Sequence, residues 1–218
     1  MHPISYLSFL DSKNHDHFLL TNGHTMESLI NTAGELIADW VNIHYPTSNI
    51  LGCIGTGNNG KDILSAFQKL PNNRTYFTFI IDPKTTETDA YKKLLKTKTI
   101  TPIAAIEDLP SNTIILDGIY GTGLNKPIQP NIQSIINTIN QLPNHVISID
   151  VPSGLSESEN NTCINATITL SMMFPKKVFQ TNKKKHCGTI YVLNFNLSQH
   201  DRNDYKFPNT IDKHIKLT

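Results

Sequence analysis

The stretch LGCIGTGNNGKDILSAF (51–67) fits three phosphate-binding patterns at once. Its glycines satisfy G-x-G-x-x-G, residues 55–61 satisfy G-x-x-x-x-G-K, and the GNNG core suits neither of those families well. A glycine-rich turn ahead of a helix suits phosphate, because the first backbone N–H groups of the helix point at the ligand. The function therefore depends on which pattern this loop represents.

A P-loop nucleoside triphosphatase is one reading of the loop. It needs Ser or Thr after the Lys to hold Mg²⁺, whereas this chain has Asp62 there, which would bring negative charge toward the nucleotide phosphates. The segment IILDG (114–118) resembles the acidic strand of such enzymes. This reading stays open as a minor alternative.

A dinucleotide-binding Rossmann domain is the second reading. That fold places an acidic residue about twenty positions after the last glycine to hold a ribose hydroxyl. Asp82 lies near this spacing. The reading leaves the Asn58–Asn59 pair unexplained, because a plain pyrophosphate turn does not need two adjacent amides.

Periodicity predicts the elements that must position this loop. Apolar positions from Met26 to Val41 recur at helical steps after a capping Thr25, and short apolar runs alternate with further helical segments. Strands are predicted at 50–55, 76–81, 113–117, 145–150, 166–171 and 188–195, and helices at 26–41, 61–70, 86–96 and 130–142.

Strands that alternate with helices predict parallel βαβ units and a doubly wound α/β sheet. Ligands of such sheets bind beyond the carboxyl ends of the strands. The loops after Gly55, Asp117 and Asp150 all fall at that edge, so we expect them to form one site.

Composition places the chain among ordinary globular proteins. With 218 residues it fits a single domain (1–218), with a core at about 25–197 and a polar, loosely packed tail at about 199–218. A net charge of +1 and the lack of a long apolar run predict no nucleic-acid partner and no membrane. Three scattered cysteines and no export signal favour a cytoplasmic location.

Three loops taken together give the third reading. GTGNNGKD (55–62), DGIYGTGLNKPI (117–128) and SIDVPSGL (148–155) resemble, in order and spacing, the G-x-G-N-N-G-G-D, D-A-x-F-G-T-G-L and D-I-P-S-G motifs of the YjeF N-terminal domain family. INTAG (30–34) is similar to the M-E-x-A-G helix of that family, and FPKK (174–177) is similar to its A-P-K segment. The resemblance covers about residues 25–197.

The resemblance implies an NAD(P)H-hydrate epimerase, which interconverts the R and S forms of nicotinamide nucleotides hydrated at C6 of the reduced ring (NADHX or NADPHX). It implies a Rossmann-like three-layer α/β/α sandwich, usually a homodimer. It also implies cooperation with a separate dehydratase, because no kinase-like dehydratase domain is expected in these 218 residues. A catalytically silent scaffold of the same fold remains an alternative.

The family's site residues carry over onto the matching positions. The substrate loops would contribute Asn58, Asn59, Gly60, Lys61, Asp62, Gly121, Thr122, Gly123, Leu124, Asn125, Lys126 and Asp150. The family also carries a monovalent cation, typically K⁺, whose ligands map onto Asn59, Asp117 and Ser153. Oxygen ligands of this kind suit a hard cation.

The resemblance makes Asp150 the first candidate for acid/base chemistry and Lys176 the second. Epimerisation at a carbinolamine carbon proceeds through loss of the hydroxyl or through ring opening, and both routes need proton transfer. Lys61 departs from the family motif, which has a second Gly at that position. Its side chain would reach a substrate phosphate or point into solvent.

Overall fold

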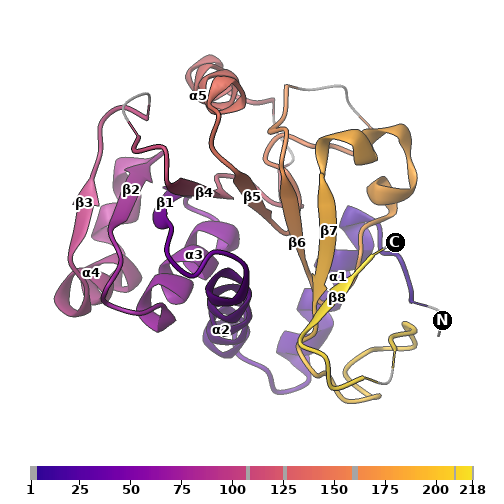
Figure 1. Cartoon of the computed structure of the whole chain (residues 1–218). Helices are drawn as coiled ribbons and strands as arrows, with labels where there is room; N and C mark the ends of the chain where they lie inside the picture. The colour runs from indigo at the N-terminus through magenta and orange to yellow at the C-terminus, as the bar shows by residue number, and fades with distance from the viewer. Residues whose placement is uncertain (1–3, 107–108, 125–126, 159–161, 209, 218) are drawn as a thin grey trace.

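The chain forms an α/β fold around one eight-stranded sheet in the order β3-β2-β1-β4-β5-β6-β7-β8 (Figure 1). The computed structural model describes residues 4–106, 109–124, 127–158, 162–208 and 210–217. The strands are β1 (Asn49–Ile54), β2 (Tyr76–Ile80), β3 (Ile100–Pro102), β4 (Thr113–Gly118), β5 (Val146–Ile149), β6 (Ile168–Met172), β7 (Thr189–Leu193) and β8 (His214–Lys216). The α-helices are α1 (Phe9–Thr21), α2 (Met26–His44), α3 (Asn58–Lys69), α4 (Asp89–Thr97) and α5 (Pro130–Gln141), and the 3₁₀ turns are η1 (Pro83–Glu87), η2 (Lys177–Gln180) and η3 (Asn182–His186).

The strand order reverses beside β1. The chain runs from β1 outward through β2 to β3, then returns to place β4 on the other side of β1 and continues outward to β7. These strands are all parallel, and only β8 runs antiparallel, against β7. The loops after β1 and β4 therefore diverge at a topological switch point, where open α/β sheets bind ligands.

Two apolar layers cover the sheet and make it a three-layer sandwich. One layer packs α2, α3 and α4 around the buried Trp40 and Phe67, and the other packs α5 through Ile132, Ile136 and Ile139. Figure 1 shows α2, α3 and α4 on one side of the sheet and α5 on the other. The central strands are buried on both faces, as expected for parallel strands.

Helices α2 and α3 pack against each other at very close range. A Cβ atom added to Gly34 of α2 would lie 2.3 Å from Ser65 Oγ and 2.7 Å from the Ser65 backbone carbon on α3. The glycine of the INTAG segment thus serves the approach of two helices. This contact sets the position of α3, whose first turn faces the site.

The predicted doubly wound sheet and six of its eight strands are confirmed, β3 was not predicted, and three further features differ from the prediction. Helix α3 begins at Asn58 instead of Lys61, so the two asparagines belong to its first turn. The helix expected at 86–96 is split into η1 and α4 because Thr88 caps a new helix. The expected loose tail at 199–218 is wrong for 214–216, which form β8.

Helix α1 was not expected from the sequence at all. Its apolar residues show no helical stripe, but Ser8 and Asp11 form a capping box at its start. The only available signal was therefore the SFLD tetrapeptide at 8–11, which fits the capping pattern. None of the described helices has the length and apolar character that a membrane span needs.

Gly34→Ala should destabilise the fold. The added methyl improves helix propensity by about 1 kcal/mol, but overpacking against the Ser65 backbone costs more, and we expect a net loss of about 1–2 kcal/mol in the free energy of unfolding. Urea denaturation measures this value. Glu35→Ala, on the exposed face of α2, is the control and should stay within about 0.5 kcal/mol of the parent. A stable Gly34→Ala protein would contradict the close approach of the helices.

Candidate functional site

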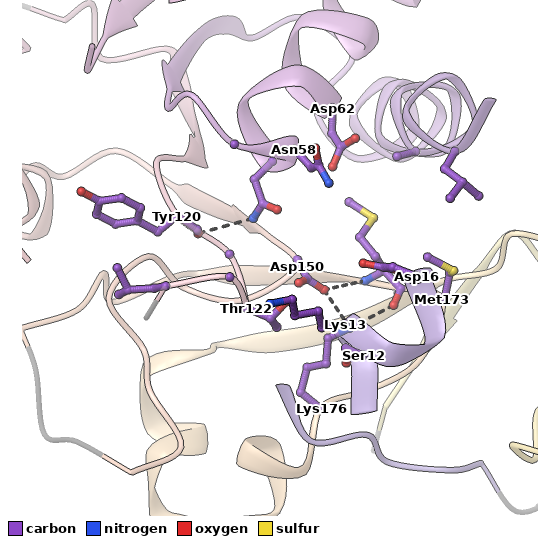
Figure 2. A pocket seen from close by; sticks show the side chains of 18 of the residues that line it. Ser12, Lys13, Asp16, Asn58, Asp62, Tyr120, Thr122, Asp150, Met173 and Lys176 are labelled. Carbon is purple, nitrogen blue, oxygen red and sulfur yellow. Dashed lines mark hydrogen bonds and ion pairs between the residues drawn. The ribbon is translucent and has the colours of Figure 1, made fainter. Parts of the chain in front are cut away.

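A cavity of about 570 Å³ opens at the topological switch point. Its walls come from α1, α2, the first turn of α3 and the loops that follow β1, β4, β5 and β6. Figure 2 shows polar side chains of these elements facing a common space. Met26, Leu29, Ile30 and Ala33 of α2 form an apolar wall opposite the polar loops. An apolar wall with a few convergent polar groups is typical of a small-molecule site.

The first turn of α3 presents free backbone donors to the cavity. Gly57 is the N-cap residue and provides no side-chain cap, and Asn58 and Asn59 follow it along the cavity wall. No atom lies within 4 Å of where a Gly57 Cβ would stand. The uncapped N–H groups and the helix dipole can therefore bind an anionic group such as phosphate.

The Asn59 side chain joins all three sequence loops. Its Nδ2 donates to the Ile149 carbonyl at 2.5 Å and to the Tyr120 carbonyl at 3.4 Å. Gly121 lies so close that a Cβ there would stand 2.6 Å from Asn59 Oδ1. The second asparagine of the NNG core thus holds the loop after β4 and the end of β5 against α3.

The Asp117 carboxylate lies fully buried at the end of β4, beneath the cavity. Its Oδ2 accepts hydrogen bonds from Ser148 Oγ at 2.7 Å and Ser153 N at 2.9 Å. Its Oδ1 accepts from Ser153 Oγ at 2.5 Å and from Ile119 N at 3.3 Å. The Ser153 hydroxyl also lies 3.0 Å from the Tyr120 carbonyl, which gathers several oxygen atoms at one point.

Burial is the main influence on the charge state of Asp117. Loss of water raises its pKa above the ordinary range, and the hydrogen bonds from Ser153, Ser148 and Ile119 oppose that rise. Among the described residues, no cationic side chain pairs with this carboxylate. The buried negative charge is therefore compensated by hydrogen bonds alone, and a bound cation would complete the compensation.

Asp150 and Lys176 form a buried ion pair at the floor of the cavity, as Figure 2 shows. The Nζ of Lys176 lies 2.8 Å from Asp150 Oδ1 and also donates to the carbonyls of Met172 (3.0 Å) and Phe174 (2.9 Å). Asp150 has a φ of +68°, in the left-handed region. Such a backbone costs about 1 kcal/mol or more for a non-glycine residue and is common at functional sites.

Asp62 faces the cavity from α3 with no hydrogen-bond or ion-pair partner among the described residues. The side chain is only 6% exposed. Burial, followed by the negative charges of Asp150 and Asp16, raises its pKa well above the ordinary value, and Lys61 opposes the rise. A buried carboxyl without a partner is costly to the fold and available to a ligand.

Asp16 is a cavity residue that the sequence reasoning missed. It lies on α1, and Figure 2 shows it beside Asp150. Burial, followed by the charge of Asp150, raises its pKa to about 6, against a smaller opposing effect of Lys176. It was missed because α1 itself was missed.

Most of the residues expected at the site do line the cavity. These are Asn58, Asn59, Asp62, Gly121, Thr122, Gly123, Leu124, Asp150 and Lys176. Asp117 and Ser153 lie together below it. Asn125 and Lys126 are outside the described residues.

Three residues that the sequence suggested as ligands lie outside the cavity wall. Lys61 does not line the cavity, and its backbone closes the first turn of α3. Gly60 does not line it either, because it packs on the Gly55 carbonyl, 2.1 Å from where its Cβ would stand. Asp82, the ribose ligand of the Rossmann reading, lies outside the cavity wall and caps η1 through Lys84 N.

This arrangement can bind an anion at one end and transfer protons at the other. The start of α3 offers backbone donors, while Asp16, Asp62, Asp150 and Lys176 bring titratable groups to the same cavity. Carboxyl groups whose environments separate their pKa values are typical of general acid/base catalysis.

Comparison with known proteins agrees with this site. A family model described as "YjeF-related protein N-terminus" matches residues 26–178. The NAD(P)H-hydrate epimerase of Weissella koreensis is 27% identical over 156 residues, which cover 68% of this chain and 71% of that protein. The NAD(P)H-hydrate epimerase of Plasmodium vivax is 29% identical over 197 residues, 84% of this chain and 68% of that protein.

Two further similarities concern architecture. The crystal structure of the yeast protein ynu0 (YNL200c) superposes with a TM-score of 0.79 at 20% identity, over 98% of this chain and 100% of the other, and so shares its fold. A bifunctional NAD(P)H-hydrate repair enzyme of Dictyoglomus turgidum is 29% identical over 151 residues, which are 63% of this chain and 29% of that enzyme.

Asp62→Asn should stabilise the protein, and the gain should grow as the pH rises. The folded-state pKa of Asp62 is raised, so above about pH 4 the unfolded chain releases this proton while the folded protein keeps it. Stability of the parent then falls with rising pH, and the Asn variant lacks this loss. We expect a gain of about 1 kcal/mol or more at pH 8 and none at pH 4, measured by urea denaturation. Glu35→Gln controls for loss of an exposed carboxylate, and an equal gain at both pH values would contradict the prediction.

Proposed function

The chain belongs to the family of proteins related to the YjeF N-terminus, and on that premise we propose that it is an NAD(P)H-hydrate epimerase, an isomerase of nicotinamide nucleotide repair. The observation that supports this most is the shared cavity of the α3 N-terminus and the Asp150–Lys176 pair. One end suits the phosphates of a nucleotide, and the other suits proton transfer at its ring.

The nucleotide phosphates bind the first turn of α3. Asn58 and the free N–H groups of that turn face the cavity, and Gly123 is open to it on the opposite wall. The hydrated ring then lies toward Asp150, between the loops after β4 and β6 and the apolar side chains of α2. The apolar wall excludes water from the reacting carbon, which strengthens the charges that face it.

Asp150 is placed to act on the hydrated carbon. Loss of the hydroxyl leaves an iminium that a carboxylate stabilises, whereas ring opening gives an aldehyde and needs a proton at nitrogen. In both routes a group near the carbon must give and take back one proton. The Lys176 ammonium holds the Asp150 carboxylate at 2.8 Å and fixes its orientation.

The proposal includes a K⁺ ion held by Asn59, Asp117 and Ser153. Their oxygen atoms suit a hard monovalent cation, and Asp117 is a buried carboxylate without a cationic partner among the described residues. A bound K⁺ would supply positive charge beneath the substrate phosphates and lock the loops together. The chain's own contribution is the Asn59 amide, which already holds the Tyr120 and Ile149 carbonyls.

Three broader properties complete the proposal. The protein acts as a homodimer in the cytoplasm, a location that fits its three free, buried cysteines. Its product is passed to a separate dehydratase. The similarity to a bifunctional NAD(P)H-hydrate repair enzyme supports this cooperation.

Asp150→Asn should abolish epimerisation of NADHX. The purified R epimer is incubated with the protein in K⁺ buffer, and the S epimer is followed by chiral chromatography against the spontaneous rate. The parent should accelerate its appearance, and Asp150→Asn should lower kcat about 100-fold or more, since the carboxylate is lost while nucleotide contacts remain. Tight nucleotide binding without acceleration by the parent would instead mean a silent scaffold.

K⁺ should raise the melting temperature relative to a bulky organic cation. A ligand that binds only the folded state stabilises it, here by on the order of 1–2 kcal/mol or a few degrees at saturation. Ser153→Ala should reduce this K⁺-dependent increment by about half or more, whereas the exposed Ser111→Ala should keep it. No increment in the parent would refute the ion, and an undiminished increment in Ser153→Ala would refute Ser153 as its ligand.

A further inference from the structure

Helix α1 lies outside the segment that the family model matches, yet it is docked directly beside Lys176. Leu7 N donates to the Pro175 carbonyl at 2.9 Å, and Lys177 N donates to the Leu7 carbonyl at 2.7 Å. These two backbone hydrogen bonds form a parallel bridge that flanks Lys176 on both sides. The start of α1 is thus tied to the residue that pairs with Asp150.

Further contacts keep α1 from turning about its axis. Asp11 forms an ion pair with Lys177 at 2.9 Å. His15 is buried, packs edge-on against Phe174 with ring centroids 5.2 Å apart, and donates a 2.7 Å hydrogen bond from Nε2 to the Asp201 carbonyl. Because one face of α1 is held in this way, Asp16 faces the cavity.

The Asp16 side chain has no hydrogen-bond or ion-pair partner within the described parts of the chain. It is partly buried, and the charged groups around it are Asp62 on α3, Asp150 after β5 and Lys176 after β6. Lys13 of α1 also lines the cavity, whereas His15 is directed at Asp201. A partly buried carboxyl with these neighbours has no structural partner among the described residues that would explain its place.

We propose that Asp16 is a second catalytic residue of this site, which gives a proton to the hydroxyl on the hydrated carbon of the substrate and recovers it when water returns on the other face. The inference rests on the proposed epimerase function. Asp150 and Lys176 then stabilise the cationic ring while Asp16 handles the hydroxyl. Both carboxyl groups line the cavity, Asp16 from α1 and Asp150 from the loop after β5.

The step balances without a further reagent. The Asp16 proton passes to the hydroxyl oxygen, the C–O bond breaks with its electron pair on oxygen, and water leaves. The ring nitrogen shares its lone pair with the carbon to form the iminium. Water then attacks the opposite face, its extra proton is relayed by a second water molecule to the Asp16 carboxylate, and the other epimer results.

The charge state of Asp16 suits this task. Burial and the neighbouring Asp150 raise its pKa to about 6, so that a useful fraction carries a proton near neutral pH. Lys176 pairs with Asp150 at 2.8 Å, whereas Asp16 has no ion-pair partner among the described residues. Two carboxyl groups of one site thereby take different roles.

The test compares Asp16→Asn, Asp16→Glu and Asp212→Asn with the parent. Asp212 is the control because it is an exposed aspartate outside the cavity wall. Epimerisation of R-NADHX is followed by chiral chromatography from about pH 5.5 to about pH 8.5, with the spontaneous rate subtracted. The readouts are kcat, KM and the pH profile of kcat/KM.

Asp16→Asn should lower kcat about 100-fold and leave KM within about threefold. Parent kcat/KM should fall as the pH rises above about 6, because the proton donor is lost. Asp16→Asn should not show this decrease with pH, and Asp16→Glu should restore part of it. Asp212→Asn should match the parent.

Two results would overturn the role of Asp16 while the parent remains active. One is an unchanged kcat and pH profile in Asp16→Asn. The other is a rise in KM or a fall in melting temperature with the decrease with pH intact, which would indicate a structural role. An inactive parent that still binds the nucleotide would overturn the proposed function together with this role, so the two failures are distinguishable.

Discussion

The burial of the Asp117 carboxylate is the constraint on which the rest of the site depends. A charge this deep in the protein is tolerated only when donors surround it, and its donors come from the end of β5, from the loop after β5 and from its own loop. These hydrogen bonds to Asp117 fix the loops after β4 and β5 relative to each other. Asn59 then attaches both loops to α3, which places the anion-binding turn and Asp150 on one cavity.

The cavity above this anchor is lined by more acidic than basic side chains, three aspartates against Lys13 and Lys176. Asp16, Asp62 and Asp150 face it, and only Lys176 is paired with one of them. The cost appears in the raised pKa values of Asp16 and Asp62 and in the left-handed backbone at Asp150. Active sites commonly contain groups that lower the free energy of unfolding, because their function requires them there.

The sequence was sufficient for six of the eight strands, all except β3 and β8, and for the loops at their carboxyl ends. Parallel strands and the switch point follow from the alternation of apolar runs and helical segments, and the three loops at its edge carry nearly all cavity residues that were expected. The direction of individual side chains could not be predicted from the sequence. Lys61 and Asp62 are neighbours, but only Asp62 lines the cavity. The burial of Lys176 could not be predicted either, because it depends on partners that only the fold brings together. These are the carbonyls of Met172 and Phe174 and the Asp150 carboxylate.

The parts that the sequence concealed are those held by long-range contacts. Helix α1 lacks an amphipathic stripe because it lies over the edge of the site instead of the main core, and its partners are residues near 176, 201 and 205. Strand β8 is three residues long and forms only by pairing with β7. No local pattern predicts such segments, since their free energy comes from surfaces that exist only after the sheet has folded. Loop motifs can therefore locate a site without identifying every residue that acts in it. Asp16 is such a residue, because it reaches the cavity from α1, which no local pattern predicts.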